Sequence, residues 1–261
     1  MAIDISATAD RIIAAVDSGV PMDRLIDPVD HPTKADAFRV AQEVVRRRVA
    51  AGDAVVGFKL GNIAKAMQDK FGVDEPDYGY LLASQFEAEN LTLTSRRFIE
   101  PFVEVEPAFV LKHAVGGPNV TAVDIMQATD FVVPALEIID SRVANWEIDI
   151  FDTIADGGSC GAVIVGGAPR KLSEVNLADT TGDVLFDDEV KATGNTNAAY
   201  GNPIGAVAWL ARRISEYDVG LDPGKLILPG SILAAVRMEP GHRIAGRFRG
   251  WGEVSFDYVA G

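Results

Sequence analysis

Residues 102–111 constrain the fold and chemistry of this chain more than any other stretch. Their length and apolar content predict a β-strand, in which side chains two positions apart point to the same face. Glu104 and Glu106 are therefore expected side by side on one face. Two adjacent carboxylates within an apolar strand are costly unless a cation neutralises them, which predicts a metal site. The opposite face is apolar, with Val103, Val105, Phe109 and Leu111.

Composition favours a soluble cytoplasmic protein. The 261 residues, 48% of them hydrophobic, suffice for one large domain or a domain with a small appendage. No apolar window reaches the ~18 residues of a membrane span, and residues 1–4 lack the features of a signal peptide. The single cysteine, Cys160, excludes an internal disulfide. A formal net charge of −14 argues against a nucleic-acid partner.

The order of predicted elements indicates an α+β fold. Helices over residues 6–18 and 33–51 form an N-terminal helical subdomain, which we expect to occupy residues 1–70 and to include a short strand at 55–59 and a helix at 63–70. Residues 71–261 are expected to form a β-rich catalytic domain. Its sheet core should be mixed and mostly antiparallel.

Within the second segment, hydrophobic runs and capping residues place the elements. We expect loops at 72–79 and 152–161. Helices are predicted at 121–129, capped by Thr121, and at 203–214, where Pro203 stands at the first position. Strands are predicted at 102–111, 132–139, 162–165, 226–228, 243–248 and 253–258.

Glu137 is the natural third ligand for the predicted metal. It is the one charged residue in the apolar run 132–139, so it needs a partner there. Three carboxylates without a nearby histidine describe a hard oxygen site suited to Mg²⁺ or Mn²⁺. Spacing alone leaves open that all three are surface or ion-paired residues.

Lys59 is a candidate acid/base group or carboxylate anchor. It stands between Gly57 and Gly61, which allow backbone or ligand to approach closely. A dication and an apolar wall beside it would disfavour the ammonium form. An ordinary surface lysine at a turn fits the sequence equally.

Two loops carry further candidates. Asp74, Glu75 and Asp77 could bind metal or exchange protons, although Pro76 makes a simple turn equally consistent. The run 156–161 offers backbone N–H groups and the Ser159 hydroxyl for binding. Covalent chemistry by Cys160 is disfavoured because no activating histidine is near in sequence. The run 156–161 reads Asp156-Gly157-Gly158-Ser159-Cys160-Gly161.

Several segments in order resemble the hydratase/decarboxylase branch of the fumarylacetoacetate hydrolase superfamily, and within it the 2-hydroxypenta-2,4-dienoate (2-oxopent-4-enoate) hydratases. The similarity runs from about residue 35 to the C-terminus. The matching segments are Gly57–Gly61, Gly72–Gly79, Val103–Glu106, Val133–Arg142, Asp152–Asp156 and Gly201–Pro203.

The resemblance implies a sheet core of the superfamily's C-terminal-domain type and a metal-dependent hydratase in aromatic catabolism. Water would be added to a 2-hydroxy-2,4-dienoate to give a 4-hydroxy-2-oxo acid. Lys59 and Asp77 match positions of substrate binding and proton transfer, and Ser159 lines the same pocket. The metal, Mg²⁺ or Mn²⁺, would be bound by Glu104, Glu106 and Glu137. The resemblance also implies a homo-oligomer and an association with another enzyme of the same pathway.

Three positions depart from the family pattern: Pro107, which predicts a strand edge or bulge at the site, Asn62, and the run 230–234. A 2-oxo-3-hexenedioate (4-oxalocrotonate) decarboxylase is the nearest alternative, against which Asn145-Trp146 argues. Acylpyruvate-type C–C hydrolases use a His–Glu lid pair, whereas the acid next after His31 is Asp36. A non-catalytic partner subunit is a further alternative.

Overall fold

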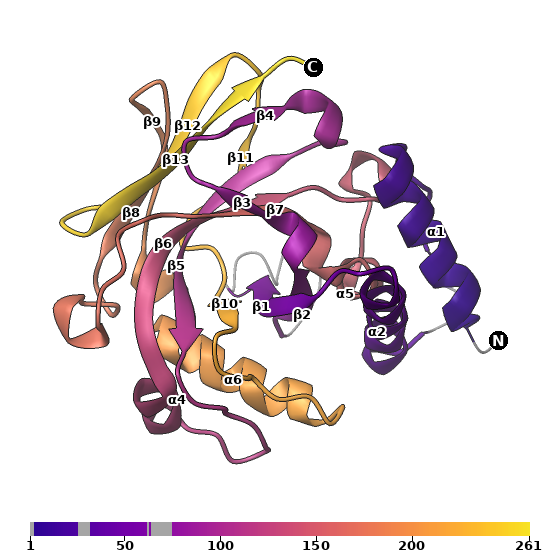
Figure 1. Ribbon diagram of the computed structural model, residues 1–261, viewed down its shortest axis with the longest axis horizontal. Helices are drawn as coiled ribbons and strands as arrows, with labels where there is room; N and C mark the ends of the chain where they lie inside the picture. Colours follow the sequence, from indigo (N-terminus) through magenta and orange to yellow (C-terminus); the bar gives the residue numbers. More distant parts are fainter. Residues whose placement is uncertain (1–2, 26–31, 62, 64–74) are drawn as a thin grey trace.

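Two β-sheets form the centre of the molecule (Figure 1). The computed structural model describes residues 3–25, 32–61, 63 and 75–261. The larger sheet has eight strands in the order β2-β1-β10-β5-β6-β7-β3, with β11 pairing with β5. Its strands are β1 (Val55–Gly61), β2 (Asp77–Leu82), β3 (Phe86–Ala88), β5 (Phe102–Leu111), β6 (Thr129–Ile139), β7 (Cys160–Val165), β10 (Leu226–Leu228) and β11 (Val236–Arg237).

The smaller sheet has five strands in the order β4-β13-β12-β8-β9. Three pairs are parallel, namely β1–β10, β3–β7 and β4–β13. The other described pairs are antiparallel, so the predicted α+β class with a mixed, mostly antiparallel sheet is confirmed. The strands are β4 (Thr92–Thr94), β8 (Thr181–Phe186), β9 (Glu189–Asn195), β12 (His242–Phe248) and β13 (Gly252–Val259).

The two faces of the larger sheet bury different sets of residues. Odd positions of β5, such as Val105 and Phe109, join the main hydrophobic core with residues of β12, β13 and α6. Even positions such as Ala108 join a second, smaller cluster with residues of β6, β7 and β10. This second face also carries Glu104 and Glu106, so the smaller apolar cluster lies beside the two carboxylates on the same face.

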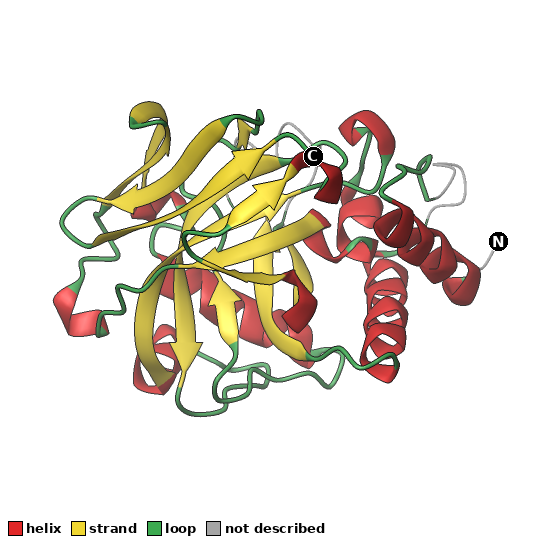
Figure 2. Cartoon of the chain, turned by 45° about the horizontal axis from the view of Figure 1, so that its top comes forward, coloured by secondary structure: helices red, strands yellow, loops and turns green. Residues whose placement is uncertain are grey.

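Helices lie at one side of the two sheets and behind the strands of the larger sheet (Figure 2). Helix α2 begins with a capping box between Thr33 and Asp36, and α1 ends at Gly19 with φ of 66°. The helices are α1 (Ile5–Ser18), α2 (Lys34–Ala50), α4 (Ala122–Ala128), α5 (Ile150–Ala155) and α6 (Pro203–Ser215). Among the described residues, no helix has the length and apolar character needed to cross a membrane.

Two predicted loops are regular structure. Asp77 begins strand β2, where a turn was expected from Pro76. Residues of the expected loop 152–161 form the end of α5 and a 3₁₀ turn at 157–159, because the Asp149 side chain caps the helix by accepting from the N–H groups of Phe151 and Asp152. The helix expected at 63–70 lies, apart from Ile63, outside the described residues.

The division into segments 1–70 and 71–261 stays a prediction. Strand β1, in the first segment, is hydrogen-bonded to β2 and β10 of the second. Helix α2 contacts β2 and α5. The N-terminal segment thus contributes a strand, and with it Lys59, to the larger sheet.

Candidate active site

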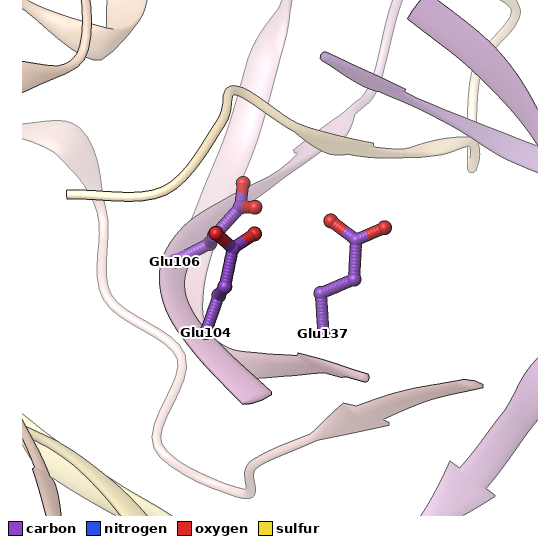
Figure 3. Close-up of side chains that lie close together, drawn as sticks. All are labelled: Glu104, Glu106 and Glu137. Atoms are coloured by element: carbon purple, nitrogen blue, oxygen red, sulfur yellow. The ribbon is translucent and has the colours of Figure 1, made fainter. Parts of the chain in front are cut away.

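Three glutamates meet on the second face of the larger sheet (Figure 3). Glu104 and Glu106 extend from β5, and Glu137 extends from β6, where it lies directly opposite Glu104 in the antiparallel ladder. One carboxylate oxygen from each lies within 4.8 Å of the others. The geometry brings together the three residues that the sequence selected as ligands.

Two of the three carboxylates are buried, and three of their four oxygens have no hydrogen-bond partner. Glu106 and Glu137 have no solvent exposure, and Glu106 Oε1 and both oxygens of Glu137 lack a hydrogen-bond partner. Burial, and next the neighbouring Glu137 charge, raises the pKa of Glu104 to about 8 and that of Glu106 well above its usual value. Orphaned, closely spaced oxygens of this kind fit a hard divalent cation.

A backbone N–H completes the surroundings of Glu106. Gly230 donates to Glu106 Oε2 at 2.6 Å. The loop that carries Gly230 enters where β5 has no strand partner on that side, between its pairing with β11 at 102–103 and with β10 at 109–110.

Pro107 lies in this gap. It is in register with Pro134 of β6, and β5 is an internal strand with no bulge at this position. Of the two expected alternatives the bulge is absent, whereas the unpaired side of β5 at Pro107 is a local strand edge. The missing N–H of Pro107 is tolerated because no β10 or β11 residue pairs there.

Lys59 faces the carboxylates from β1. Its Nζ lies 3.4 Å from Glu137 Oε1 and donates to the carbonyl of Gly158 at 2.9 Å. Burial opposes the charged form, but the surrounding carboxylates, Glu137 above all, outweigh it and raise the pKa of Lys59. Negative charge thus dominates around Lys59 when no cation is bound. The disfavouring of the ammonium that we expect beside a dication stays a prediction.

Asp77 is buried at the start of β2, opposite Gly61 of β1. The Thr153 hydroxyl of α5 donates to its Oδ2 at 3.1 Å. Glu75 is engaged elsewhere, in ion pairs with Lys34 and Arg213. Asp74 lies outside the described residues.

The close approach of Asp77 to β1 predicts the effect of Gly61→Ala. A Cβ at Gly61 would stand 2.3 Å from Asp77 Oδ1, so the carboxylate must move. We expect a loss of ~1–3 kcal/mol of stability and a larger fall in activity. Gly205→Ala is the matched control, because its Cβ would meet nothing closer than 3.8 Å. Thermal unfolding and turnover measure both effects, and wild-type behaviour of Gly61→Ala would contradict them.

Ser159 is buried beside Lys59 in a turn of unusual backbone. Gly158 and Ser159 have φ of 72° and 54°, and a Cβ at Gly158 would stand 2.4 Å from the Lys59 side chain. The Ser159 hydroxyl donates to Asp156 Oδ2 at 3.1 Å. Asp156 is in turn ion-paired with Arg142.

Cys160 follows this turn and is buried. Burial, with the Glu137 charge second, raises the pKa of its thiol well above the usual value. A raised pKa disfavours the thiolate that covalent chemistry would need. His242 pairs with Asp187, and His31 lies outside the described residues. The question of a His–Glu lid pair thus falls outside the described part of the chain.

The candidate residues share one pocket of about 520 Å³. It is lined by Lys59, Asp77, Glu104 and Ser159, together with Thr153 and residues of the 231–235 loop. Four of the six predicted site residues thus line one cavity. The other two, Glu106 and Glu137, adjoin the lining residue Glu104, and Glu137 also pairs with Lys59.

Comparison with known proteins places the chain in a family, although no protein-family profile matches it. It is 37% identical over 239 residues to 2-oxo-hept-4-ene-1,7-dioate hydratase of Escherichia coli, covering 88% of this chain and 90% of that protein. Identity is 32% to 2-hydroxyhexa-2,4-dienoate hydratase of Comamonas testosteroni, covering 98% and 97%. The chain belongs to the 2-hydroxydienoate hydratase family. The resemblance drawn from the sequence motifs is confirmed.

Two solved structures share the fold of this chain. The 4-oxalocrotonate decarboxylase from Pseudomonas putida G7, complexed with magnesium and adipate, superposes with a TM-score of 0.95 at 32% identity, covering 98% of this chain and 97% of that one. Fumarylpyruvate hydrolase from Pseudomonas aeruginosa, in complex with Mn²⁺ and pyruvate, gives 0.57 at 16% identity, covering 78% and 89%. The second likeness shows the fold alone.

Sequence reasoning missed the residues that position this hydratase-family site. Arg142 donates to the carbonyls of Asp140 and Cys160, and so joins β6 to the 157–159 turn. Asp140 accepts from the N–H groups of Ile99 and Glu100, just before β5. Asp140 and Arg142 belong to the matching segment Val133–Arg142, which was the sequence signal for them. Their positioning role depends on contacts with residues 14 to 41 positions away in the chain.

Proposed function

We propose that the chain is a metal-dependent hydro-lyase that adds water to a 2-hydroxy-2,4-dienoate and yields a 4-hydroxy-2-oxo acid. The observation that carries this proposal is the buried carboxylate cluster that faces a single lysine in one pocket. The hydratase names of its relatives supply the reaction.

Glu104, Glu106 and Glu137 would hold Mg²⁺ or Mn²⁺. When bound, the cation would supply Lewis-acid stabilisation of the negative charge that develops on the C2 oxygen of the substrate. Magnesium and calcium occur in the complexes of the related decarboxylase, which supports a hard dication. The orphaned oxygens of Glu106 and Glu137 are the feature of this chain that supports binding.

Lys59 would move the protons. The Gly158 carbonyl and Glu137 fix its ammonium, so a proton donor is aimed into the pocket. The dienol loses its hydroxyl proton and gains one at C5, which gives the conjugated 2-oxo-3-enoate. Water then adds its oxygen at C4 and a proton is delivered to C3. Asp77, oriented by Thr153, would orient Lys59 or accept the proton of the water.

Ser159 would contact the substrate from the turn beside Lys59, since it lines the same pocket. Its hydroxyl proton is directed to Asp156, which leaves its oxygen lone pairs to accept. The Gly157-Gly158 backbone allows the turn to approach Lys59 closely.

The pKa of Glu104 gives an expectation for metal-free protein. A carboxyl whose folded-state pKa is raised from 4.5 to about 8 stabilises the fold below pH 4.5, and this contribution is lost as the pH rises through about 8. Metal-free protein should therefore lose stability between pH 5 and 8.5. Mg²⁺ should raise the melting temperature more at pH 8.5 than at pH 5.5, because binding needs ionised carboxylates. Equal shifts at both pH values would contradict the site.

The related decarboxylase supports a second candidate function, because its structure superposes with a TM-score of 0.95. A decarboxylase would expel CO₂ from a 2-oxo-3-hexenedioate with the same carboxylates and lysine. Purified protein with Mg²⁺ should be given 2-hydroxypentadienoate and 2-hydroxymuconate in parallel while dienol absorbance and CO₂ are followed. Consumption of 2-hydroxypentadienoate without release of CO₂ supports the hydratase. Release of CO₂ from 2-hydroxymuconate supports the decarboxylase. No loss of either, with metal bound, favours a non-catalytic subunit.

The biological setting stays a prediction. Homo-oligomerisation, association with another enzyme of the same pathway and a cytoplasmic location are expected from the sequence and its resemblance. Aromatic catabolism is the expected role, with a small-molecule substrate and neither nucleic acid nor membrane as partner.

A further inference from the structure

The pocket changes from charged to apolar along β5 and β6. Phe102 lies one same-face position beyond Glu104, and Ile139 lies one beyond Glu137. Phe102 and Ile139 are themselves opposite each other in the ladder, and both line the pocket. Two strand residues span ~6.6–6.8 Å, so the apolar pair begins that far from the carboxylate pair.

Trp146 extends this apolar wall. Its ring meets the Phe102 ring edge to face, with centroids 5.4 Å apart at 87°. The indole N–H donates to the carbonyl of Glu100 at 3.0 Å, so its polar atom is already satisfied. Asn145 and Trp146 both have positive φ, 56° and 55°. Such conformations cost free energy and persist where the surroundings hold them in place.

The facing wall is the 231–235 loop. Leu233, Ala234 and Ala235 line the pocket, and the Ser231 hydroxyl donates to the carbonyl of Leu233 at 2.8 Å, which fixes the turn. The cavity of about 520 Å³ is in the size range of pockets for ligands considerably larger than a five-carbon acid.

Positive charge in the described pocket lining is confined to the carboxylate end, and the charge near Trp146 is the carboxylate of Glu100. Among the described residues that line the pocket, Lys59 is the one cation. Arg237 stands just outside, 5.9 Å from the centroid of Phe102, but its guanidinium is paired with Glu100 at 2.9 Å. A second substrate carboxylate would meet the Glu100 charge and apolar side chains, and both oppose its transfer from water.

We infer that the substrates are 2-hydroxy-2,4-dienoates whose C5 substituent is an apolar alkyl group, and that dicarboxylates are discriminated against. This inference rests on the proposed function, which places the substrate's C1 and C2 oxygens at the glutamates. The tail then extends between Trp146, Phe102 and Leu233. The relative from E. coli is named for a dioate and the related decarboxylase was complexed with adipate, so this tail preference separates the chain from both.

Binding of unreactive 2-oxo acids tests the inference apart from turnover. Pyruvate, 2-oxohexanoate and 2-oxohexanedioate are titrated into Mg²⁺-loaded protein by calorimetry. Each buried methylene contributes about fourfold in affinity, so 2-oxohexanoate should bind at least about tenfold more tightly than pyruvate. It should also bind more tightly than the dioate. A dioate that binds as well as 2-oxohexanoate overturns the inference. If that binding order holds but no dienoate is hydrated, the proposed function fails and the tail preference stands.

Two variants test which residues determine the discrimination against 2-oxohexanedioate. Ala234→Arg adds a cation at an exposed lining position, and Glu100→Gln frees Arg237. Both should raise the affinity for 2-oxohexanedioate by about fivefold or more, with little change for pyruvate. Ala114→Arg, the same change at an exposed alanine outside the pocket, should leave the dioate affinity unchanged. Equal effects of Ala234→Arg and Ala114→Arg would overturn the inference.

Discussion

Lys59→Met lowers turnover by ~10²–10⁴-fold, the range expected for loss of a positioned general acid/base. The substitution retains an unbranched chain in a buried position that is 3% exposed, so packing beside the 157–159 turn is kept. What is removed is the ammonium, which lies 3.4 Å from Glu137 and donates to the Gly158 carbonyl. Steady-state kinetics with a 2-hydroxy-2,4-dienoate measures the effect.

Two readouts separate proton transfer from a structural role. The variant should still bind Mg²⁺ by calorimetry, since its three carboxylates are intact, and should still bind a 2-oxo acid. Lys112→Met, at an exposed position, is the matched control and should behave as wild type. Near-native turnover of Lys59→Met would remove Lys59 from the mechanism.

Glu106→Gln weakens Mg²⁺ binding by at least ~100-fold, beyond the 10–100-fold that loss of a supporting group costs. The amide oxygen can still accept from the Gly230 N–H, which donates to Glu106 Oε2 at 2.6 Å, so the loop stays in place. Activity should fall with the loss of metal and recover in part at high Mg²⁺. Calorimetry and a metal titration of turnover measure both.

The stability of the metal-free variant distinguishes a ligand from a structural residue. Burial, and next the Glu137 charge, raises the pKa of Glu106, so its ionised form is unfavourable in the fold. Metal-free Glu106→Gln should therefore be at least as stable as metal-free wild type at pH 8. Glu253→Gln, on the exposed edge of β13, should change neither property. A large loss of metal-free stability in Glu106→Gln would assign Glu106 a structural role.

Local alternation in the sequence predicted the core of this site. Residues 102–111 form β5 as expected, with Glu104 and Glu106 on one face and Val103 and Val105 on the other. Glu137 stood out as the lone acid in an apolar strand. Each of these two signals arises within a single strand, because the side-chain period of a strand is fixed at two.

The contacts between different strands could not be predicted from the alternation of side chains within each strand. Lys59 reaches Glu137 because β1, β10, β5 and β6 are neighbours in that order, a pairing of segments far apart in sequence. The Gly230 N–H is a backbone group with no side-chain signal, and the Pro107 gap depends on where β10 ends and β11 begins.

Two elements were misassigned for local reasons. Pro76 and Gly79 surround the start of β2 and gave it the composition of a turn, whereas pairing with β1 makes it a strand. Helix α5 has only six residues, and its Asp149 cap was overlooked. Asp77 and Thr153, one from each element, are therefore the pair whose contact only the structure reveals.

The most direct test follows the oxygen of water into the product. Metal-free protein is given 2-hydroxypenta-2,4-dienoate in H₂¹⁸O with and without Mg²⁺, and the fragment that carries the C4 hydroxyl is analysed by mass spectrometry. Hydration at C4 predicts ¹⁸O in that hydroxyl, formed only when Mg²⁺ is present. Product without label at C4, or labelled product at the same rate in metal-free protein, would contradict a metal-dependent hydratase.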